Sequence, residues 1–260
     1  ALGLPHNMKA SSAYPVDSLR SGNFTQKFGI ATTIMDYARY NYVAQPGDEN
    51  IRFVRQLGPY DDYSIEWGYR YFGKSPKEEK EILKTFVDEK SLNPIYMFGG
   101  YGNDPNSQTE NIGDDPVKAS MYGINNLKIV AKNLKEWTVE PKENYNELDE
   151  LYGELIGVYR RYIYHVLNLV GGIYDTPHNE NQKGVVRYVN VDINKQMEAL
   201  KFMEKNLWNT QNWLMDKSLI SQIKGEGVLG SIQGLQLSAF NRLLSESKLN
   251  RILSAGESLE

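Results

Sequence analysis

The chain has no cysteine and only three histidines among its 260 residues. The lack of cysteine excludes disulfide bonds, a cysteine nucleophile and thiolate metal ligands. Any metal site in this chain must therefore rely on very few side-chain ligands.

Basic residues are in a slight minority, with 29 Lys and Arg against 33 Asp and Glu, and no basic block occurs along the chain. This charge balance argues against nucleic acid as a partner. Long apolar runs are also missing, since no stretch approaches the ~18 residues that identify a membrane-spanning helix. What is present is the composition of a globular protein, 40% hydrophobic and 24% charged, with 18 tyrosines that suit cores, cleft walls and wet interfaces.

Helix signals become strong from residue 75 onward. Ser75 is a capping residue, Pro76 occupies the first helical position and Glu78 falls in the first turn, which predicts a helix to about residue 91. Apolar residues at 3-4-3 spacing predict the clearest helix over 144–170. Other helices are predicted over 116–137, 194–208 and, as the best of the remaining short ones, 238–254.

One β-hairpin is predicted within residues 173–191, where a polar turn precedes a β-branched, partly alternating run that ends at Val191. The first ~70 residues lack sustained periodicity and hold many small, polar and aromatic side chains, which indicates ordered loop with short helical turns. The predicted fold class is therefore mainly α, multi-helical, with one β-hairpin.

The most specific spacing lies near the start of the chain. Gly3, Leu4, Pro5 and His6 reproduce the tail of the pattern H-E-x-x-H-x-x-G-x-x-H. In that pattern the glycine adopts a positive φ and turns the chain sharply, which brings the third histidine to the metal held by the first two. A second motif, Ile34-Met35-Asp36-Tyr37, follows further along the chain.

In this order the two segments resemble the zinc metallopeptidases of the metzincin type, in which a tight turn, the Met-turn, places a methionine beneath the zinc. Tyr37 matches the position where the astacin and serralysin branches carry a tyrosine near the metal. Gly58-Pro59-Tyr60-Asp61 and Ile65-Glu66-Trp67-Gly68-Tyr69 are in turn similar to a group of large bacterial zinc metallopeptidases. The similarity covers most of the chain.

The resemblance implies a zinc cofactor and the hydrolysis of peptide or protein substrates by metal-activated water. It makes His6 the third zinc ligand, preceded by the turn at Gly3. Met35 is expected to form an apolar floor under the imidazoles, and Tyr37 to hydrogen-bond the oxyanion. The other two histidines and the catalytic glutamate would fall just before Ala1, in the missing N-terminal half of the module, so this chain alone is expected to be inactive.

The same resemblance suggests a domain organisation. Residues 1–73 are expected to be the Met-turn-containing lower portion of a metzincin-like catalytic module, and residues 74–260 to form a helical C-terminal domain. An exported protein, located in the cell envelope or outside the cell, is expected from the relatives.

Simpler interpretations stay open for each of these side chains. His6 also fits a surface histidine beside a proline turn, Met35 a core methionine that fills an irregular gap, and Tyr37 one of many packing tyrosines. His165, on the long helix, and His178, in a polar turn, have no partner at metal-ligand spacing, and both are expected to be solvated.

Acidic residues offer two further candidates. The loop over 104–115 lacks the ligand spacing of an EF-hand, which favours a solvated loop over a calcium site. Asp61, Asp62 and Glu66 fit a paired-carboxylate glycosidase site only if the fold brings them to the required separation. The alternative to a peptidase is a non-catalytic helical module that binds a partner or polysaccharide through its tyrosines, and a degenerate peptidase without the metal falls between the two.

Overall fold

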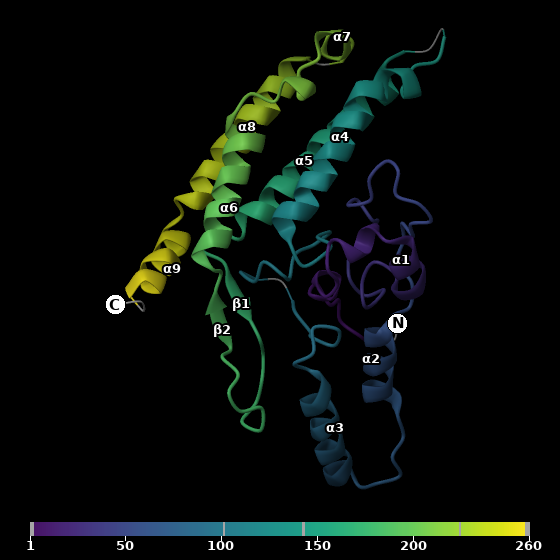
Figure 1. Ribbon diagram of the computed structural model, residues 1–260, viewed down its shortest axis with the longest axis vertical. Helices are drawn as coiled ribbons and strands as arrows, with labels where there is room; N and C mark the ends of the chain where they lie inside the picture. The colour runs from purple at the N-terminus through teal and green to yellow at the C-terminus, as the bar shows by residue number, and fades with distance from the viewer. Residues whose placement is uncertain (1–2, 101, 142–143, 224, 258–260) are drawn as a thin grey trace. The chain divides into compact units, whose positions relative to one another are not determined.

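The computed structural model describes residues 3–100, 102–141, 144–223 and 225–257 (Figure 1). It confirms a mainly helical fold with one two-stranded antiparallel sheet. The chain divides into two compact units, Ala1–Ala119 with Ile173–Asn190, and Ser120–Gly172 with Val191–Glu260. No helix in the described part of the chain is both long and apolar enough to span a bilayer.

The first unit combines short helices with long ordered loops. Residues 1–73, the predicted portion of a catalytic module, lie entirely within it, and their identity as a functional module stays a prediction. Strands β1 and β2 pair with Tyr174 opposite Val189. The elements of this unit are η1 (Ala10–Ser12), η2 (Ser18–Arg20), α1 (Gly22–Phe28), α2 (Pro59–Tyr69), α3 (Pro76–Lys90), β1 (Ile173–Asp175) and β2 (Tyr188–Asn190).

Helix α3 begins where the capping signals predict. The Ser75 backbone N–H donates to Glu78 Oε2 at 3.0 Å, and the Glu78 backbone N–H donates to Ser75 Oγ at 3.4 Å. This reciprocal capping box satisfies two amides that a helix start leaves without partners.

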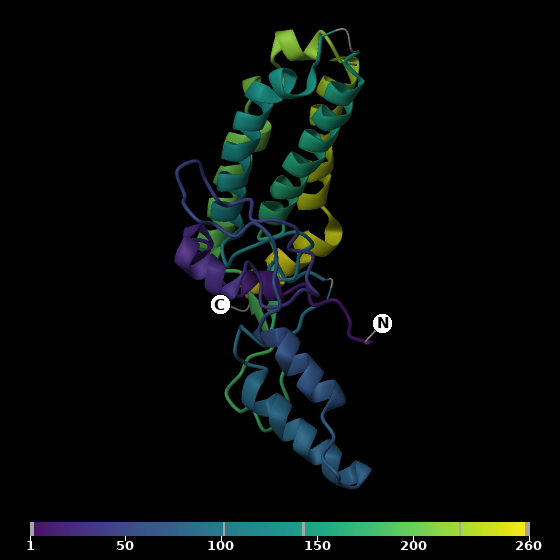
Figure 2. The same ribbon diagram turned by 90° about the vertical axis from the view of Figure 1, so that its right-hand side faces the viewer.

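Helix α2 lies beside α3, as both ribbon views show (Figures 1 and 2). The ring of Tyr63 on α2 stacks on that of Phe86 on α3 at a centroid distance of 5.2 Å. The Lys90 ammonium lies 4.9 Å from the centroid of Phe86, 5.1 Å from that of Tyr96 and 5.8 Å from that of Tyr63. This aromatic cage around a cation fastens the two helices together.

The second unit is built on long helices that run alongside one another (Figure 2). Helix α5 contacts both α6 and α8, and its Tyr159 side chain is fully buried and donates a hydrogen bond to the Asn206 carbonyl. Its elements are α4 (Pro116–Thr138, whose first turn belongs to the first unit), α5 (Asn146–Leu167), α6 (Ile193–Met203), the π-helical turn η3 (Glu204–Trp208), η4 (Asn212–Leu214), α7 (Lys217–Ile220), α8 (Gly225–Leu243) and α9 (Glu246–Glu257).

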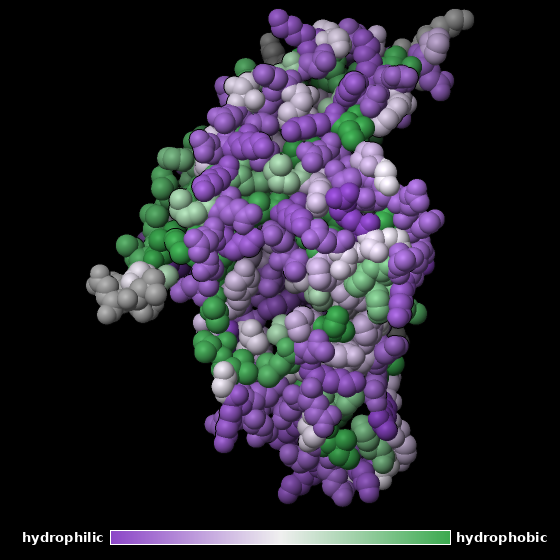
Figure 3. Space-filling view, in the orientation of Figure 1, coloured by the Kyte–Doolittle hydropathy of each residue, from purple (hydrophilic) through white to green (hydrophobic). Residues whose placement is uncertain are grey.

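Close packing in this unit depends on one glycine of α4. A Cβ atom on Gly123 would lie 2.5 Å from the Tyr162 ring of α5. The Ser120 hydroxyl, one turn earlier, donates to the Tyr162 carbonyl at 3.2 Å. The surface of the unit also carries apolar side chains over α8 and α9 (Figure 3), where Phe240 and Leu253 are among the exposed residues.

Two sequence predictions for this unit are wrong. The helix predicted over 238–254 is two helices, because α8 ends at Leu243 and Ser245 accepts the Lys248 amide at 3.0 Å as the start of α9. His165 is only 3% exposed instead of solvated, since α5 is covered on more of its circumference than its apolar stripe indicates. His178 is exposed, as predicted.

Candidate metal centre

The two segments predicted to form a zinc site lie against each other. The rings of His6 and Tyr37 have their centroids 4.6 Å apart with an interplanar angle of 35°. One residue further along, the Asn7 backbone N–H donates to the Met35 carbonyl at 3.2 Å. The segment that carries His6 and the predicted Met-turn, Ile34 to Tyr37, are therefore in direct contact within the first unit.

Gly3 has the backbone conformation that the motif requires. Its φ is +71°, and a Cβ atom added there would have no neighbour within 4 Å. The conformation, and not the space available, thus favours glycine at this position, because other residues reach positive φ only with strain. The turn leads directly into Leu4, Pro5 and His6.

The start of the Met-turn is held by a carboxylate from α2. Asp61 Oδ1 accepts the Thr33 hydroxyl at 2.6 Å, and Oδ2 accepts the Ile34 amide at 3.2 Å and the Gly58 amide at 2.8 Å. The Thr33 Oγ1 in turn accepts the Met35 amide at 3.0 Å. Asp61 thereby fixes the backbone that carries Met35, and it caps the N-terminus of α2 at the same time.

Gly58 is needed for this arrangement. A Cβ atom on it would lie 2.3 Å from the Thr32 carbonyl oxygen. The Tyr60 amide donates to that same oxygen at 3.0 Å, so the first turn of α2 lies directly on the segment that enters the Met-turn.

Asp36 lies between Met35 and Tyr37 and is completely buried. Its Oδ2 accepts the Ser11 amide at 2.7 Å, and its Oδ1 has no hydrogen-bond partner in the described part of the chain. Burial raises the pKa of this carboxyl to about 6, against the lowering effect of Ser11, the Tyr37 backbone and Arg55. Through the hydrogen bond from Ser11, the side chain anchors this turn to the segment at residue 11.

Asn7 joins the His6 segment to a second loop. Its Nδ2 donates to the Met97 carbonyl at 2.9 Å, and its Oδ1 accepts the Gly99 amide at 3.0 Å. The Met8 amide donates to the Gly99 carbonyl at 2.8 Å. The buried stretch directly after His6 is thus hydrogen-bonded both to Met35 and to the loop at Met97 and Gly99. These bonds limit the positions that the His6 ring can take.

The residues present fit part of a zinc site and not the whole. His6 is exposed and Tyr37 is half-buried, so an imidazole and a phenol face outward together. Zinc sites use three or four protein ligands, and the described residues contain no cluster of three or more potential metal-ligating side chains. His178 lies in a polar turn, where its Nδ1 is 3.1 Å from the Thr176 carbonyl oxygen.

The acidic candidates have structural roles instead. Asp61 is 7% exposed and already accepts three hydrogen bonds, which leaves little of its carboxylate for a glycosidase reaction. The loop over 104–115 is buried in large part, contrary to the prediction of a solvated loop. Asp104 pairs with Lys9 at 2.6 Å and Glu110 with Arg39 at 2.9 Å.

A family model described as Met-zincin matches residues 1–260. No curated protein and no solved structure matches the chain.

Proposed function

The chain belongs to the Met-zincin family, and from that premise we propose that it takes part in the zinc-dependent hydrolysis of peptide bonds. The observation that carries the proposal is the contact between the His6 and Tyr37 rings beside the backbone hydrogen bond from Asn7 to Met35. The His6 segment and the Met35–Tyr37 segment are far apart in the sequence, and a metzincin-like site requires them to meet.

In this proposal His6 would be one ligand of the zinc ion, and Met35 would form an apolar floor for the imidazoles. A zinc ion held there would supply a water ligand with a pKa lowered to about 7 and would polarise the scissile carbonyl. The Tyr37 phenol, held against the His6 ring, donates a hydrogen bond to the oxyanion as it forms. Peptides or proteins are the substrates.

The remaining ligands and the general base are proposed to come from a His-Glu-x-x-His segment directly before Ala1. A single imidazole binds zinc weakly, because a site gains its affinity from several ligands held at fixed geometry. We therefore expect the 260-residue chain alone to bind zinc weakly and to hydrolyse no peptide. Substantial zinc-dependent peptidase activity from this chain alone would contradict the assignment of ligands.

The test uses the protein extended to include the preceding segment, with metal content measured after dialysis. We expect His6→Ala to lose the bound zinc and His178→Ala, a change at another exposed histidine, to retain it. Equal zinc content in the two variants would reject His6 as a ligand. If the unmodified protein itself retains no zinc, a non-catalytic helical module or a degenerate peptidase is the better description.

The role of Tyr37 is tested separately by Tyr37→Phe, which keeps the ring against His6 and removes only the hydroxyl. We expect zinc content to stay unchanged and kcat to fall by about 10²-fold to 10³-fold, as for the loss of an oxyanion donor. Tyr40→Phe, at an exposed neighbouring tyrosine, is the matched control. An unchanged kcat in Tyr37→Phe would rule out the catalytic role.

A further inference from the structure

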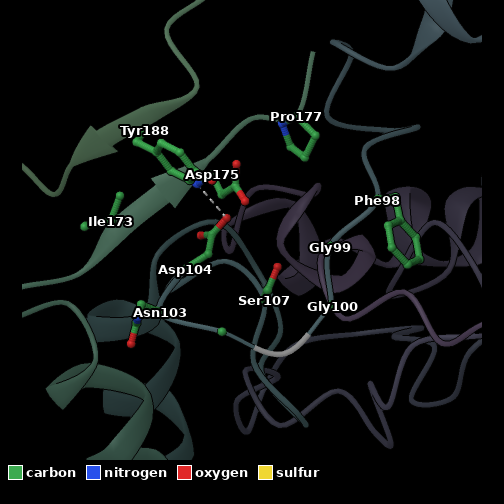
Figure 4. Close-up of a pocket in the computed structure, with 11 residues that line it drawn as sticks. Phe98, Gly99, Gly100, Asn103, Asp104, Ser107, Ile173, Asp175, Pro177 and Tyr188 are labelled. Atoms are coloured by element: carbon green, nitrogen blue, oxygen red, sulfur yellow. Dashed lines mark hydrogen bonds between the residues drawn. The ribbon is translucent and has the colours of Figure 1, made fainter. Parts of the chain in front are cut away.

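A pocket of about 340 Å³ lies in the first unit and is lined in part by Gly99, whose amide N–H donates to the Asn7 side chain. Its walls are the rings of Phe98 and Tyr188, and Asp104 and Ser107 lie on its floor (Figure 4). Gly100 contributes exposed backbone. The volume falls within the range of pockets that bind small molecules or single side chains.

The Ser107 hydroxyl is the feature that points to a ligand. Ser107 is 5% exposed, and Figure 4 shows its oxygen directed into the pocket. Its backbone N–H donates to the Asp104 carbonyl at 2.9 Å. Because the hydroxyl oxygen borders the pocket, it is available to a molecule that enters.

The backbone of the loop is adapted to this hydroxyl. A Cβ atom on Gly99 would lie 2.2 Å from Ser107 Oγ and 2.8 Å from Lys9 Cβ. Any side chain at position 99 would therefore displace the hydroxyl or close the floor of the pocket.

The charges that line the pocket are already balanced. Asp104 is paired with the buried Lys9 ammonium at 2.6 Å, and Asp175 is paired with Arg187 at 3.0 Å. Lys9 also donates to the Asp175 carbonyl at 2.6 Å. A cationic or anionic ligand would meet no free counter-charge here, and a neutral group that both donates and accepts hydrogen bonds fits the Ser107 end better.

The aromatic walls specify the rest of the ligand. Phe98 and Tyr188 are 43% and 59% exposed, so their rings can pack on another ring, and aromatic pairs gain free energy beyond burial alone. A phenol group has one donor and one acceptor on the same oxygen. A tyrosine side chain therefore matches both the walls and the floor.

The pocket is close to the candidate metal centre. Met8 pairs with Gly99 at the pocket rim, 2.8 Å from amide N to carbonyl O, and Met8 is two residues from His6. Because a chain spans at most ~3.6 Å per residue, the rim lies within about 10 Å of His6. An extended peptide covers that distance in about three residues.

We propose that this pocket is a subsite for a tyrosine side chain of a peptide substrate, located about two or three residues from the scissile bond. Its connection to hydrolysis rests on the proposed function. Binding of the tyrosine itself does not depend on zinc.

The test is a titration of the 260-residue chain, without metal, with the peptide acetyl-Gly-Gly-Tyr-Gly-Gly-amide, followed through backbone amide NMR signals. We expect saturable shifts at Gly99, Gly100 and Ser107. The same peptide with Phe should bind more weakly, and the peptide with Arg weaker still. Ser107→Ala should weaken tyrosine binding about threefold to tenfold, the effect of one hydrogen bond, without lowering the stability of the fold.

The control is Ser64→Ala, which removes a similarly buried hydroxyl that donates to the Asp61 carbonyl at 3.0 Å. This variant should bind the tyrosine peptide normally. The proposal is overturned if no saturable shift appears at about 10 mM peptide, where even millimolar binding is visible. It is also overturned if the Phe or Arg peptide binds as well as the Tyr peptide, or if Ser107→Ala has no effect.

The two proposals can fail independently. Tyrosine binding in the pocket without zinc-dependent hydrolysis by the extended protein would reject the peptidase and retain a peptide-binding site. Hydrolysis by the extended protein without tyrosine binding in the pocket would retain the peptidase and reject the subsite.

Discussion

Replacing Asp61 tests whether the Met-turn is held from α2. Asp61→Ala removes three hydrogen bonds to a carboxylate and leaves the Ile34 and Gly58 amides without that partner. At roughly 1.5 kcal/mol for each such bond, the lower end for hydrogen bonds to a charged group, we expect the free energy of unfolding of the first unit to fall by about 4 to 5 kcal/mol. That is a large fraction of the ~5–15 kcal/mol typical of a folded domain.

The assay is urea unfolding combined with hydrogen exchange at the Ile34 and Gly58 amides. Asp62→Ala is the matched control, since Asp62 is the next residue, has the same charge and is exposed. It should lose only the few tenths of a kcal/mol that an acidic residue gains at a helix N-terminus. Equal destabilisation by the two variants, or unchanged protection of the Ile34 amide in Asp61→Ala, would refute the reasoning.

If Asp61→Ala does not fold, Asp61→Asn provides the same test with a smaller loss of folding stability. The asparagine keeps one acceptor oxygen for the two amides and loses the acceptor for the Thr33 hydroxyl, so we expect a loss of about 1 to 2 kcal/mol. Combined with Thr33→Val it should show a coupling free energy of at least about 0.5 kcal/mol. Additive effects would mean that the two side chains act independently.

Two further predictions concern packing and pH. Lys90→Met should destabilise the first unit by about 1 kcal/mol relative to Lys80→Met, an exposed lysine on the same helix, because it removes the cation from the aromatic cage; equal urea midpoints would contradict this. Burial, with Arg251 and Arg242 nearby, lowers the pKa of Lys248 to about 8. The pKa of this lysine in the unfolded chain is ~10.4. Between pH 8 and that value the unfolded chain holds a proton that the folded chain has released. The stability of the unmodified protein relative to Lys248→Met should therefore rise through this window by up to about 3 kcal/mol, and it should stay constant below pH 8. A difference that does not change between pH 7 and pH 10 would reject the lowered pKa.

The helices that sequence analysis predicted well have local causes. The start of α3 follows from Ser75, Pro76 and Glu78, which lie next to one another, and α5 follows from its own apolar spacing. Helix α2 was missed, although Pro59 at its first position and Asp61 two residues later were usable signals. The break between α8 and α9 was also missed, although Ser245 directly before α9 and Glu246 in its first turn were usable signals. Tertiary contacts hold α9 as well, since Lys248 donates to the Leu167 carbonyl of α5 at 3.0 Å.

Some features of the candidate site were likewise predicted from the sequence, and others were not. The positive φ of Gly3 and the pairing of His6 with Tyr37 were anticipated because a known spacing pattern encodes a long-range contact. Asp61 and Asn7 were not anticipated, because each acts through long-range hydrogen bonds that only the fold reveals. Ser107 was not anticipated either, because only the fold places it in the lining of a pocket. Asp61, for instance, reaches back 28 residues to Thr33.

Asn7 connects the two proposals physically. Its backbone N–H holds the Met35 carbonyl, while its side chain holds Met97 and Gly99 at the edge of the pocket. A substrate side chain that packs against the Gly99 loop therefore presses on a residue directly bonded to His6. Asn7 is completely buried, and both ends of its side-chain amide are bonded, so it ties the loop to the His6 segment. A peptide held in the pocket would then be positioned relative to the metal ligand by one continuous hydrogen-bonded structure, without the movement of a separate lid.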